Sequence, residues 1–377
     1  MSNIVLLVTN MPTPYRTPLF NRINSKLESV GLKLIVVFGV DVESRRSWNI
    51  DYSEFEFEYV LLESNGILRK GAETLSLYYS GLFRLVLKTR PQCVITPGFS
   101  IATLKMFLTN FLLGTKYIVW TGEINLSSKR KSYNKNFVKK LCAARASKYI
   151  AYGALAKTYL TSIGVDAKDI DVAINTVDTK YFSESAIHPR EKDNINQFIY
   201  IGNLTQGKRV DLLLKAMSKI NSLGQDASLI IVGDGPMKDE LEQQSRELLL
   251  DNVKFLGYRQ KQELPQLLNE SICMLFPSEY DIWGLVLCEA MASGVPCISS
   301  NKSGATHDLI NHGVNGYAID FEDTNILVEK MIWMIKDKPG VLKMSVNAKN
   351  FMLNDASIDV SASAFSNSIL SILPKYK

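Results

Sequence analysis

Two carboxylates eight residues apart, Asp281 and Glu289, are the side chains of this sequence best placed for ligand chemistry. An apolar run ends at Phe276, a polar loop follows, and the pattern predicts a helix that opens near Gly284. A helix start presents free N–H groups and a partial positive charge, and a glycine lets a ligand approach the backbone closely, so this segment suits a diphosphate. The two carboxylates can accept hydrogen bonds from the hydroxyl groups of a bound sugar and its ribose.

Each carboxylate also has a purely structural interpretation. Asp281 can be the N-cap of the helix, a common position for Asp. Glu289 can be an exposed helix residue, but its neighbours Val286, Leu287 and Met291 are apolar, and a carboxylate in such a setting needs a partner.

A lysine, Lys208, stands where a second helix is expected to begin. The stretch from Tyr200 to Leu212 has the pattern of a strand, a turn containing Gly202 and a helix start. A cation at a helix N-terminus opposes the helix dipole, which makes better sense if an anion binds nearby. An ordinary surface lysine is the alternative interpretation.

Short apolar runs alternate with helix-like segments along the chain, which predicts an α/β protein with two parallel sheets. The runs are continuous, as expected for strands covered on both faces. Ligands bind at the carboxyl ends of such strands, so the loops after the strands should hold the chemistry. The runs are 5–8, 34–38, 93–96, 117–120 and 149–152 in the first half, and 198–201, 229–232, 253–256, 274–276 and 297–299 in the second.

The length of 377 residues suggests two domains, because single cores rarely grow beyond about 250–300 residues. The polar stretch 183–196 is the expected boundary, with an N-terminal domain at 1–185 and a C-terminal domain at 190–356. The helix-like segment 361–373 has no obvious place in the second sheet. Neither a secretory signal nor an apolar run of membrane-spanning length is found, which predicts a cytoplasmic protein. Cysteines and histidines show no metal-ligand spacing, so no metal site is expected.

Positive charge concentrates in the first half of the chain. Ten Lys and Arg residues lie between positions 101 and 150 against one carboxylate, Glu123, although the net charge is only +5. Such a cluster can attract anionic lipid head groups or a phosphate-bearing partner, and a solvated helix face is the other interpretation. The basic cluster consists mainly of Lys129, Arg130, Lys131, Lys135, Lys139, Lys140, Arg145 and Lys148.

Several glycine-containing motifs follow one another through the second half. They are Gly202-Asn203-Leu204 with Lys208, Val232–Pro236, Phe255–Gly257, Pro277–Gly294, Gly304 and Gly313–Gly316. Together and in this order they resemble glycosyltransferase family 4, also called group 1, whose members have the GT-B fold. The first half resembles the family more loosely, through Pro12–Phe20 and Trp120–Glu123.

The resemblance implies an α/β, GT-B architecture of two Rossmann-like, doubly wound domains that face each other across a cleft. The N-terminal domain would bind the acceptor and the C-terminal domain the donor, with residues 357–377 crossing back to the N-terminal domain as a helix. The implied donor-site residues are Lys208 for the diphosphate, Gly284 and Leu285 for the same phosphates, Glu289 for the ribose, Asp281 for the sugar, Leu256, Gly257 and Tyr258 beside the base, and Gly202, Asn203 and Arg209 around Lys208.

Two donor-side positions depart from the family pattern. The family's E-x7-E pair reads Asp281 and Glu289 here, so the first carboxylate is one methylene shorter and Glu279 is a rival for the sugar contact. Asn203 replaces a basic residue that the family often has beside the first glycine, which leaves Lys208 with more of the phosphate charge.

The acceptor side departs as well, because many members carry a histidine there and none precedes His188 in this chain. Glu123, after the 117–120 run, or Arg16, in the first loop, would supply that contact to the reacting centre. The implied catalytic residues are therefore Lys208, Asp281 and one of this pair. A dedicated base is unnecessary if the departing phosphate takes the acceptor proton in a front-face reaction.

The resemblance also implies a retaining enzyme without metal or other cofactor. Its donor would be a UDP- or GDP-sugar, and its acceptor a glycan or a polyprenyl-diphosphate-linked glycan of a surface polysaccharide such as O-antigen lipopolysaccharide, capsule or exopolysaccharide. It would work in the cytoplasm or as a peripheral protein on an anionic membrane surface, with no nucleic-acid partner.

The same motifs also fit other functions. A sugar-nucleotide epimerase has the same two-domain architecture, and a non-catalytic nucleotide-sugar-binding module would share the site. Gly233-Asp-Gly235 alone is too short to indicate NAD binding. Asp169-Ile-Asp171 resembles the D-x-D metal motif of another transferase fold, but its place in a chain of two α/β units favours coincidence.

Overall fold

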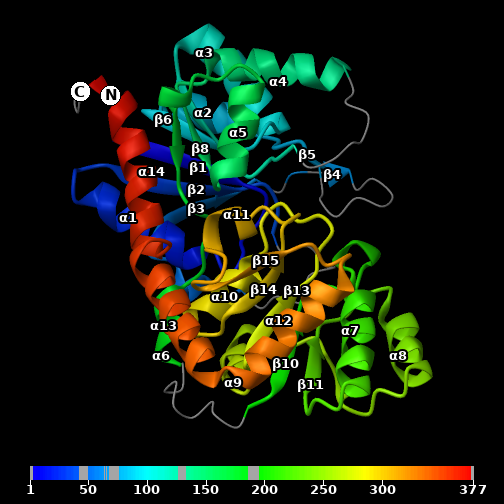
Figure 1. The fold of residues 1–377 in the computed structure, drawn as a ribbon. Helices are drawn as coiled ribbons and strands as arrows, with labels where there is room; N and C mark the ends of the chain where they lie inside the picture. Colours follow the sequence, from blue (N-terminus) through cyan, green and yellow to red (C-terminus); the bar gives the residue numbers. More distant parts are fainter. Residues whose placement is uncertain are drawn as a thin grey trace. The chain divides into compact units, whose positions relative to one another are not determined.

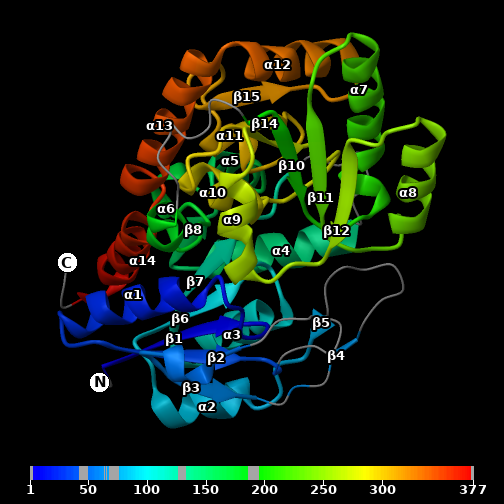
Figure 2. The same cartoon turned by 90° about the horizontal axis from the view of Figure 1, so that it is seen from below.

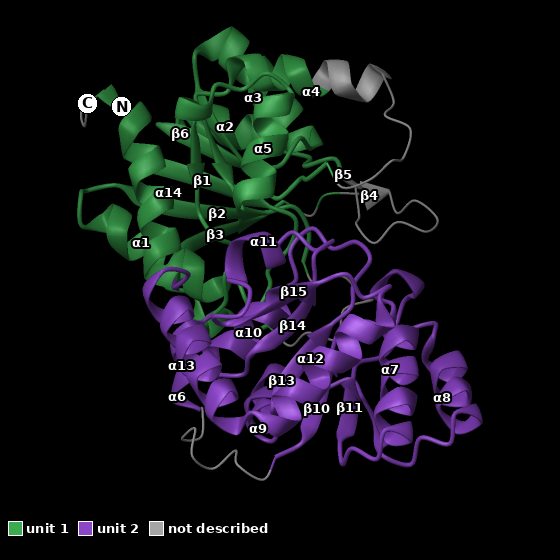
Figure 3. Cartoon of the chain, in the orientation of Figure 1, with its two compact units in different colours: residues 1–177, 358–377 green, residues 178–357 purple. Residues whose placement is uncertain are grey.

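The structure is a computed structural model that describes residues 3–41, 50–62, 64, 66–67, 76–125, 133–185 and 195–374. The chain divides into two compact units (Figure 3). Unit 1 consists of Met1–Val177 and Ile358–Lys377, and unit 2 of Asp178–Ser357. Within the described ranges, no helix combines the length and the apolar content that crossing a bilayer requires.

Unit 1 is built on a parallel sheet with the strand order β3-β2-β1-β6-β7-β8-β9 (Figure 1). Its order reverses between β1 and β6. The strands are β1 (Ile4–Thr9), β2 (Lys33–Phe38), β3 (Glu58–Leu61), β6 (Cys93–Pro97), β7 (Lys116–Thr121), β8 (Lys148–Ala151) and β9 (Ile170–Val172), with a separate antiparallel pair of β4 (Gly66–Ile67) and β5 (Ser76–Leu77). The helices are α1 (Thr17–Glu28), α2 (Leu82–Thr89), α3 (Ile101–Leu113), α4 (Tyr133–Arg145), α5 (Ala154–Ser162) and α14 (Ile358–Ile372).

Both faces of this sheet are buried, which explains the continuous apolar runs. In β1, Val5 and Leu7 join the core on the side of α1 and α14, whereas Leu6 and Val8 join the core on the side of α2 and α3. The terminal helix α14 belongs to unit 1, which is where the family resemblance places residues 357–377. Its Phe365 ring packs edge-on against Trp120 with centroids 5.1 Å apart.

Unit 2 is a second parallel sheet with the order β12-β11-β10-β13-β14-β15, which reverses between β10 and β13. The helices α7 and α12 lie side by side in both views (Figures 1 and 2). The strands are β10 (Gln197–Ile201), β11 (Ser228–Val232), β12 (Val253–Gly257), β13 (Cys273–Phe276), β14 (Cys297–Ser300) and β15 (Gly316–Ile319). The helices are α6 (Thr179–Glu184), α7 (Val210–Ser222), α8 (Lys238–Glu247), α9 (Leu264–Asn269), α10 (Leu285–Ala292), α11 (Thr306–Leu309), α12 (Thr324–Lys336) and α13 (Lys338–Asn354).

The division between the units lies at Val177 and Asp178, upstream of the polar stretch 183–196 named from the sequence. The reason is α6, which contacts α10 and α13 of unit 2. The Lys349 ammonium donates to the Ser183 carbonyl at 2.8 Å and helps to hold α6 there. Residues 186–194 of the polar stretch lie outside the described residues.

Candidate functional site

The loops after β10 and β13 flank the point where the strand order of unit 2 reverses. Parallel strands end at the same edge of a sheet, and ligands bind where neighbouring loops diverge at such a reversal. The two loops are joined by a hydrogen bond from the Glu279 N–H to the Gly207 carbonyl at 2.9 Å. Lys208 and Asp281, which the sequence singles out separately, therefore lie in adjacent loops.

Lys208 and Asp281 form an ion pair. Lys208 ends a 3-10 turn, Gln206–Lys208, and its ammonium contacts the Asp281 Oδ2 atom. Both side chains are about one-fifth exposed, at 20% and 19%, so the pair is within reach of solvent and of a ligand. The Lys208 Nζ atom also lies 5.9 Å from the centroid of the Phe276 ring.

The Asp281 loop is fixed by its own contacts. The Asp281 Oδ1 atom accepts from the Trp283 N–H at 3.2 Å, and the Asp281 carbonyl accepts from the Gly304 N–H at 2.9 Å. Ser303 Oγ donates to the Trp283 carbonyl at 2.9 Å. The alternative in which Asp281 is the helix N-cap is wrong, because α10 begins at Leu285 and Gly284 is its N-cap.

Gly284 has a left-handed backbone, with φ of 99°, that strains any other residue. A Cβ atom there would lie 2.7 Å from the Phe276 ring, so glycine is required sterically as well. The position that the sequence assigns to close phosphate approach thus directly precedes the first helical residue, Leu285. Helix starts leave their first N–H groups without intrahelical partners, and these are available to an anion.

Glu289 lies in the second turn of α10 and is partly buried. Its Oε2 atom is inaccessible to solvent and accepts no hydrogen bond from any residue that the structure describes. Burial raises the pKa of the carboxyl to about 7, against the opposing charge of Lys261. The alternative interpretation of Glu289 as an exposed helix residue is therefore wrong. Its buried Oε2 atom is a hydrogen-bond acceptor that a ligand donor could satisfy.

The turn expected beside the base is close to Glu289. Burial raises the pKa of Tyr258, and the charges of Glu263 and Glu289 add to the shift, so Tyr258 and Glu289 lie within electrostatic range. Tyr258 is 46% exposed and follows Gly257, whose φ is 71°. No pattern in the sequence points to Lys261, because its nearness to Glu289 arises only from the fold.

The glycines of Gly233-Asp-Gly235 are explained by packing between backbones. A Cβ atom on Gly233 would lie 1.9 Å from the Gly202 carbonyl oxygen, and one on Gly235 would lie 2.5 Å from that of Leu204. The Leu204 N–H donates to the Asp234 carbonyl at 2.9 Å. The loops after β10 and β11 thus support each other, and the motif needs no dinucleotide to account for it.

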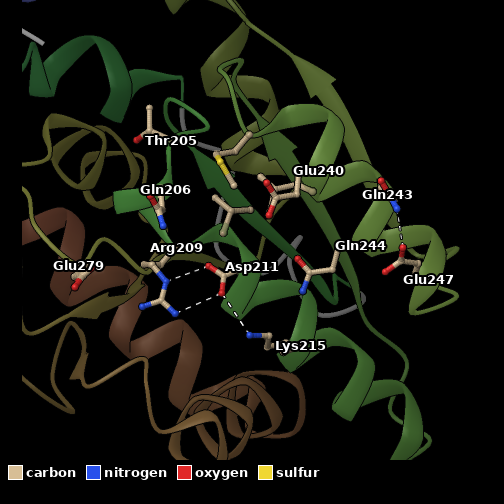
Figure 4. A pocket seen from close by; sticks show the side chains of 13 residues that line it. Thr205, Gln206, Arg209, Asp211, Lys215, Glu240, Gln243, Gln244, Glu247 and Glu279 are labelled. Carbon is tan, nitrogen blue, oxygen red and sulfur yellow. Dashed lines mark hydrogen bonds and ion pairs between the residues drawn. The ribbon is translucent and has the colours of Figure 1, made fainter. Parts of the chain in front are cut away.

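Arg209 is drawn into a different set of contacts from Lys208. Its Nε atom donates to Asp211 Oδ1 at 3.1 Å, and its Nη1 atom contacts Glu322. Figure 4 shows Asp211 between Arg209 and Lys215, in a polar pocket of about 600 Å³ that is also lined by Glu279. Lys208, Asp281 and Glu289 do not line this pocket. Asn203 is exposed, and its carbonyl accepts from the Tyr200 hydroxyl at 3.0 Å.

In unit 1, Arg16 is held at the carboxyl end of β1. Its Nη2 atom donates to the Tyr152 hydroxyl at 2.9 Å and its Nη1 atom to Thr9 Oγ1 at 3.1 Å, while its Cζ atom lies 4.5 Å from the centroid of the Trp120 ring. Among the residues that the structure describes, no carboxylate forms an ion pair with Arg16, and its buried Nε atom has no hydrogen-bond partner.

Glu123, by contrast, is already neutralised. Its carboxylate pairs with Lys139 of the basic cluster, which also donates to the Tyr159 hydroxyl at 3.1 Å. In the D-x-D sequence, Asp171 Oδ2 accepts from the Lys148 ammonium and from Ser368 Oγ, both at 2.5 Å. Asp171 therefore links β9 to β8 and to α14. Lys129, Arg130 and Lys131, and the side chain of Lys135, lie outside the described residues.

Unit 2 contains the residues that match a known protein family. Residues 183–351 match the family model described as "Glycosyl transferases group 1". The second unit is a group 1 glycosyl transferase domain. The chain aligns with N-acetyl-alpha-D-glucosaminyl L-malate synthase of Bacillus anthracis at 36% identity, over 45% of this chain and 45% of that relative. It also aligns with the UDP-Gal:alpha-D-GlcNAc-diphosphoundecaprenol alpha-1,3-galactosyltransferase of Escherichia coli at 29% identity, over 52% of each chain.

The chain thus spans about half the length of the curated relatives it matches. Solved structures cover nearly all of it. HepE of Anabaena in complex with UDP superimposes with a TM-score of 0.77 and 20% identity, over 98% of this chain and 100% of that one. The lipopolysaccharide outer core galactosyltransferase WaaB gives a TM-score of 0.71 and 20% identity, over 98% and 99%. These likenesses confirm the GT-B fold that the resemblance of the second-half motifs to the family implies.

Proposed function

We propose that this protein is a retaining glycosyltransferase that moves a sugar from a nucleotide diphosphate-sugar, bound by unit 2, to a glycan or lipid-linked acceptor of a surface polysaccharide. The convergence of Lys208, Asp281 and the start of α10 at one edge of the sheet carries the proposal. The unpartnered oxygen of Glu289 in the second turn of that helix supports it, because ribose hydroxyls are the donors it lacks. HepE of Anabaena has been crystallised with UDP and with UDP-glucose, which favours a uridine donor over a guanosine donor.

Without donor, Lys208 and Asp281 neutralise each other. An incoming diphosphate competes for the ammonium and leaves the Asp281 carboxylate able to accept from a hydroxyl of the transferred sugar. As the bond from the sugar C1 to the phosphate oxygen breaks, Lys208 and the α10 start stabilise the charge on the leaving diphosphate. The departing phosphate oxygen takes the proton of the acceptor hydroxyl while the new C1–O bond forms on the same face. No metal is needed in this scheme, and undiminished turnover in chelator is expected.

For the acceptor we propose a polyprenyl-diphosphate-linked glycan at the inner face of the cell membrane. The E. coli relative named above acts on a diphosphoundecaprenol-linked sugar, and another relative is the lipopolysaccharide 1,6-galactosyltransferase of Salmonella typhimurium, 31% identical over 46% of this chain. Arg16 fits an acceptor contact better than Glu123, because Glu123 is paired with Lys139 whereas Arg16 has no carboxylate partner among the described residues.

The first experiment is a thermal-shift screen of UDP, GDP and their sugars, since a ligand bound to the native state raises the unfolding temperature by mass action. The proposal expects stabilisation by one nucleotide and slow hydrolysis of its sugar without acceptor. Conversion of the nucleotide sugar to its epimer with no second substrate would establish an epimerase instead. Binding without any hydrolysis or transfer would establish a non-catalytic module.

A further inference from the structure

Helix α3 of unit 1 carries its large apolar side chains on the outside. Leu104, Leu108, Phe111 and Leu112 are exposed by 40, 51, 65 and 65%. Their spacing of four, three and one residues places them on one face of the helix. The opposite face, which packs on the sheet, carries the smaller or polar residues Ala102, Thr103 and Thr109 together with Met106. The helix is therefore amphipathic in the opposite sense to a surface helix of a water-soluble domain.

The neighbouring helices extend this apolar face. Both α2 and α4 contact α3. On α2, Phe83 and Leu87 are exposed by 41 and 44%, and on α4, Leu141 is exposed by 41%. In unit 2, by contrast, the exposed leucines Leu223 and Leu249 come from different elements, which is ordinary for a protein surface.

Basic side chains surround the apolar face. The Arg145 Cζ atom of α4 lies 5.1 Å from the centroid of the Phe111 ring, and its Nη1 atom donates to Asn110 Oδ1 at 3.3 Å. Arg84 and Lys88 of α2 and Lys140 of α4 are exposed. In the sequence from 74 to 165 the only carboxylate is Glu123, and Lys139 neutralises it.

We propose that the outer faces of α2, α3 and α4 form a docking surface for an anionic lipid bilayer, with Leu108, Phe111 and Leu112 inserted among the acyl chains. Apolar side chains ringed by Lys and Arg match the interface of such a bilayer, where the apolar groups enter the hydrocarbon and the cations meet the head groups. A protein partner with a hydrophobic groove would bind the apolar side chains but would not account for the Lys and Arg residues around them. The surface differs from the basic cluster predicted from the sequence, because apolar insertion, rather than charge alone, holds the protein.

The experiment is sedimentation of the full chain with vesicles. We expect binding to vesicles of phosphatidylglycerol and phosphatidylcholine, weakened by salt, and little binding to phosphatidylcholine alone. The double variant Phe111→Ser, Leu112→Ser should lower the partition coefficient by about tenfold or more, because two apolar side chains no longer enter the hydrocarbon. The matched control Leu223→Ser, Leu249→Ser removes two exposed leucines from unit 2 and should bind as the unmodified protein does.

Three results would overturn the docking surface. They are absence of binding to the anionic vesicles, equal loss in the control, and concentration-dependent self-association of the unmodified chain that the α3 variant abolishes, which would make the face an interface between copies. Because the docking surface rests on the proposed membrane-bound acceptor, hydrolysis of the nucleotide sugar without lipid is measured in parallel. The α3 variant should retain it, so a failed docking test and a failed transferase proposal give different results.

Discussion

The Lys208 ammonium is paired with the Asp281 carboxylate, 73 residues away in the chain. Lys208 lies in the loop after β10 and Asp281 in the loop after β13, the two strands between which the strand order reverses. The ion pair therefore lies at the edge of the sheet where parallel α/β folds bind ligands. A diphosphate-sugar carries an anion for Lys208 and hydroxyl groups for Asp281. Under the proposed function, we therefore expect a donor to replace this ion pair with one contact to Lys208 and one to Asp281.

Replacement of this lysine tests the phosphate contact. Lys208→Ala should lower kcat about 10²–10³-fold, because the leaving diphosphate loses a preorganised positive charge. Donor hydrolysis and transfer are measured with saturating nucleotide sugar. The matched control is Lys215→Ala, since Lys215 is an exposed lysine of the same loop and helix region that contacts Asp211 at 3.5 Å. Turnover near the unmodified level in Lys208→Ala would remove this residue from the mechanism.

Substitution of the partner separates the sugar contact from the phosphate contact. Asp281→Asn should reduce transfer from the nucleotide sugar about tenfold or more, because a neutral amide accepts sugar hydroxyl hydrogen bonds less strongly. UDP alone should bind as tightly as before or more tightly, since Lys208 no longer has an internal competitor. Calorimetry with UDP and kinetics with the sugar nucleotide measure the two effects. If Glu279→Gln, rather than Asp281→Asn, produced the loss, the rival carboxylate would be the sugar contact.

The sequence predicted the sheets and the motif-bearing loops because strand burial and glycine requirements are local properties. The run at 5–8 is apolar throughout since Val5 and Leu6 face opposite cores, and Gly284 is fixed by its own backbone and by Phe276. The partners of charged groups were not predictable. Arg209 was expected beside Lys208, yet it contacts Glu322, more than a hundred residues away, and only the fold decides between such carboxylates.

Binding of UDP should change the protonation of Glu289, the buried acid proposed to accept hydrogen bonds from the ribose. The pKa of Glu289 is raised from 4.5 to about 7 by burial, so near pH 7 part of the unliganded protein holds a proton there. Ribose hydroxyls donated to the carboxylate would favour its ionised form and lower the pKa. UDP binding between pH 6 and 7.5 should therefore release a fraction of a proton, seen as a dependence of the calorimetric enthalpy on the ionisation enthalpy of the buffer.

The variant Glu289→Gln provides the control, because it cannot ionise. Proton release should be smaller in it than in the unmodified protein, because the contribution of Glu289 is absent. A raised folded-state pKa also means that the native state holds this proton up to about pH 7 whereas the unfolded chain loses it near 4.5. Stability of the unmodified protein relative to Glu289→Gln should thus fall as the pH rises from 5 to 8. An unchanged stability difference across that range, measured by denaturant unfolding, would contradict the assigned pKa.

The N-cap of α10 tests the role of backbone conformation. Gly284→Ala must hold a side chain at φ of 99° and against Phe276, and we expect a loss of about 1–3 kcal/mol in the free energy of unfolding together with weaker UDP binding. Gly224→Ala is the matched control, with φ of 65° and no neighbouring atom within 4 Å of the added Cβ. It should cost about 1 kcal/mol and leave UDP binding unchanged. Equal effects of both substitutions on binding would mean that Gly284 is not near the phosphates.

Arg16 is expected to bind an anionic acceptor. Its guanidinium is held by the Tyr152 hydroxyl and the Trp120 ring, and it has no carboxylate partner among the described residues. Arg16→Gln should raise the KM for a diphosphate-linked acceptor about tenfold or more, since a charge-assisted contact is lost, while donor hydrolysis without acceptor stays within about twofold. Arg16→Lys should recover part of the affinity. Glu123→Gln is the comparison and should have the smaller effect, because Lys139 already neutralises that carboxylate. A loss of donor hydrolysis in Arg16→Gln would place the residue at the donor instead, and a larger acceptor effect in Glu123→Gln would exchange the roles of the two residues.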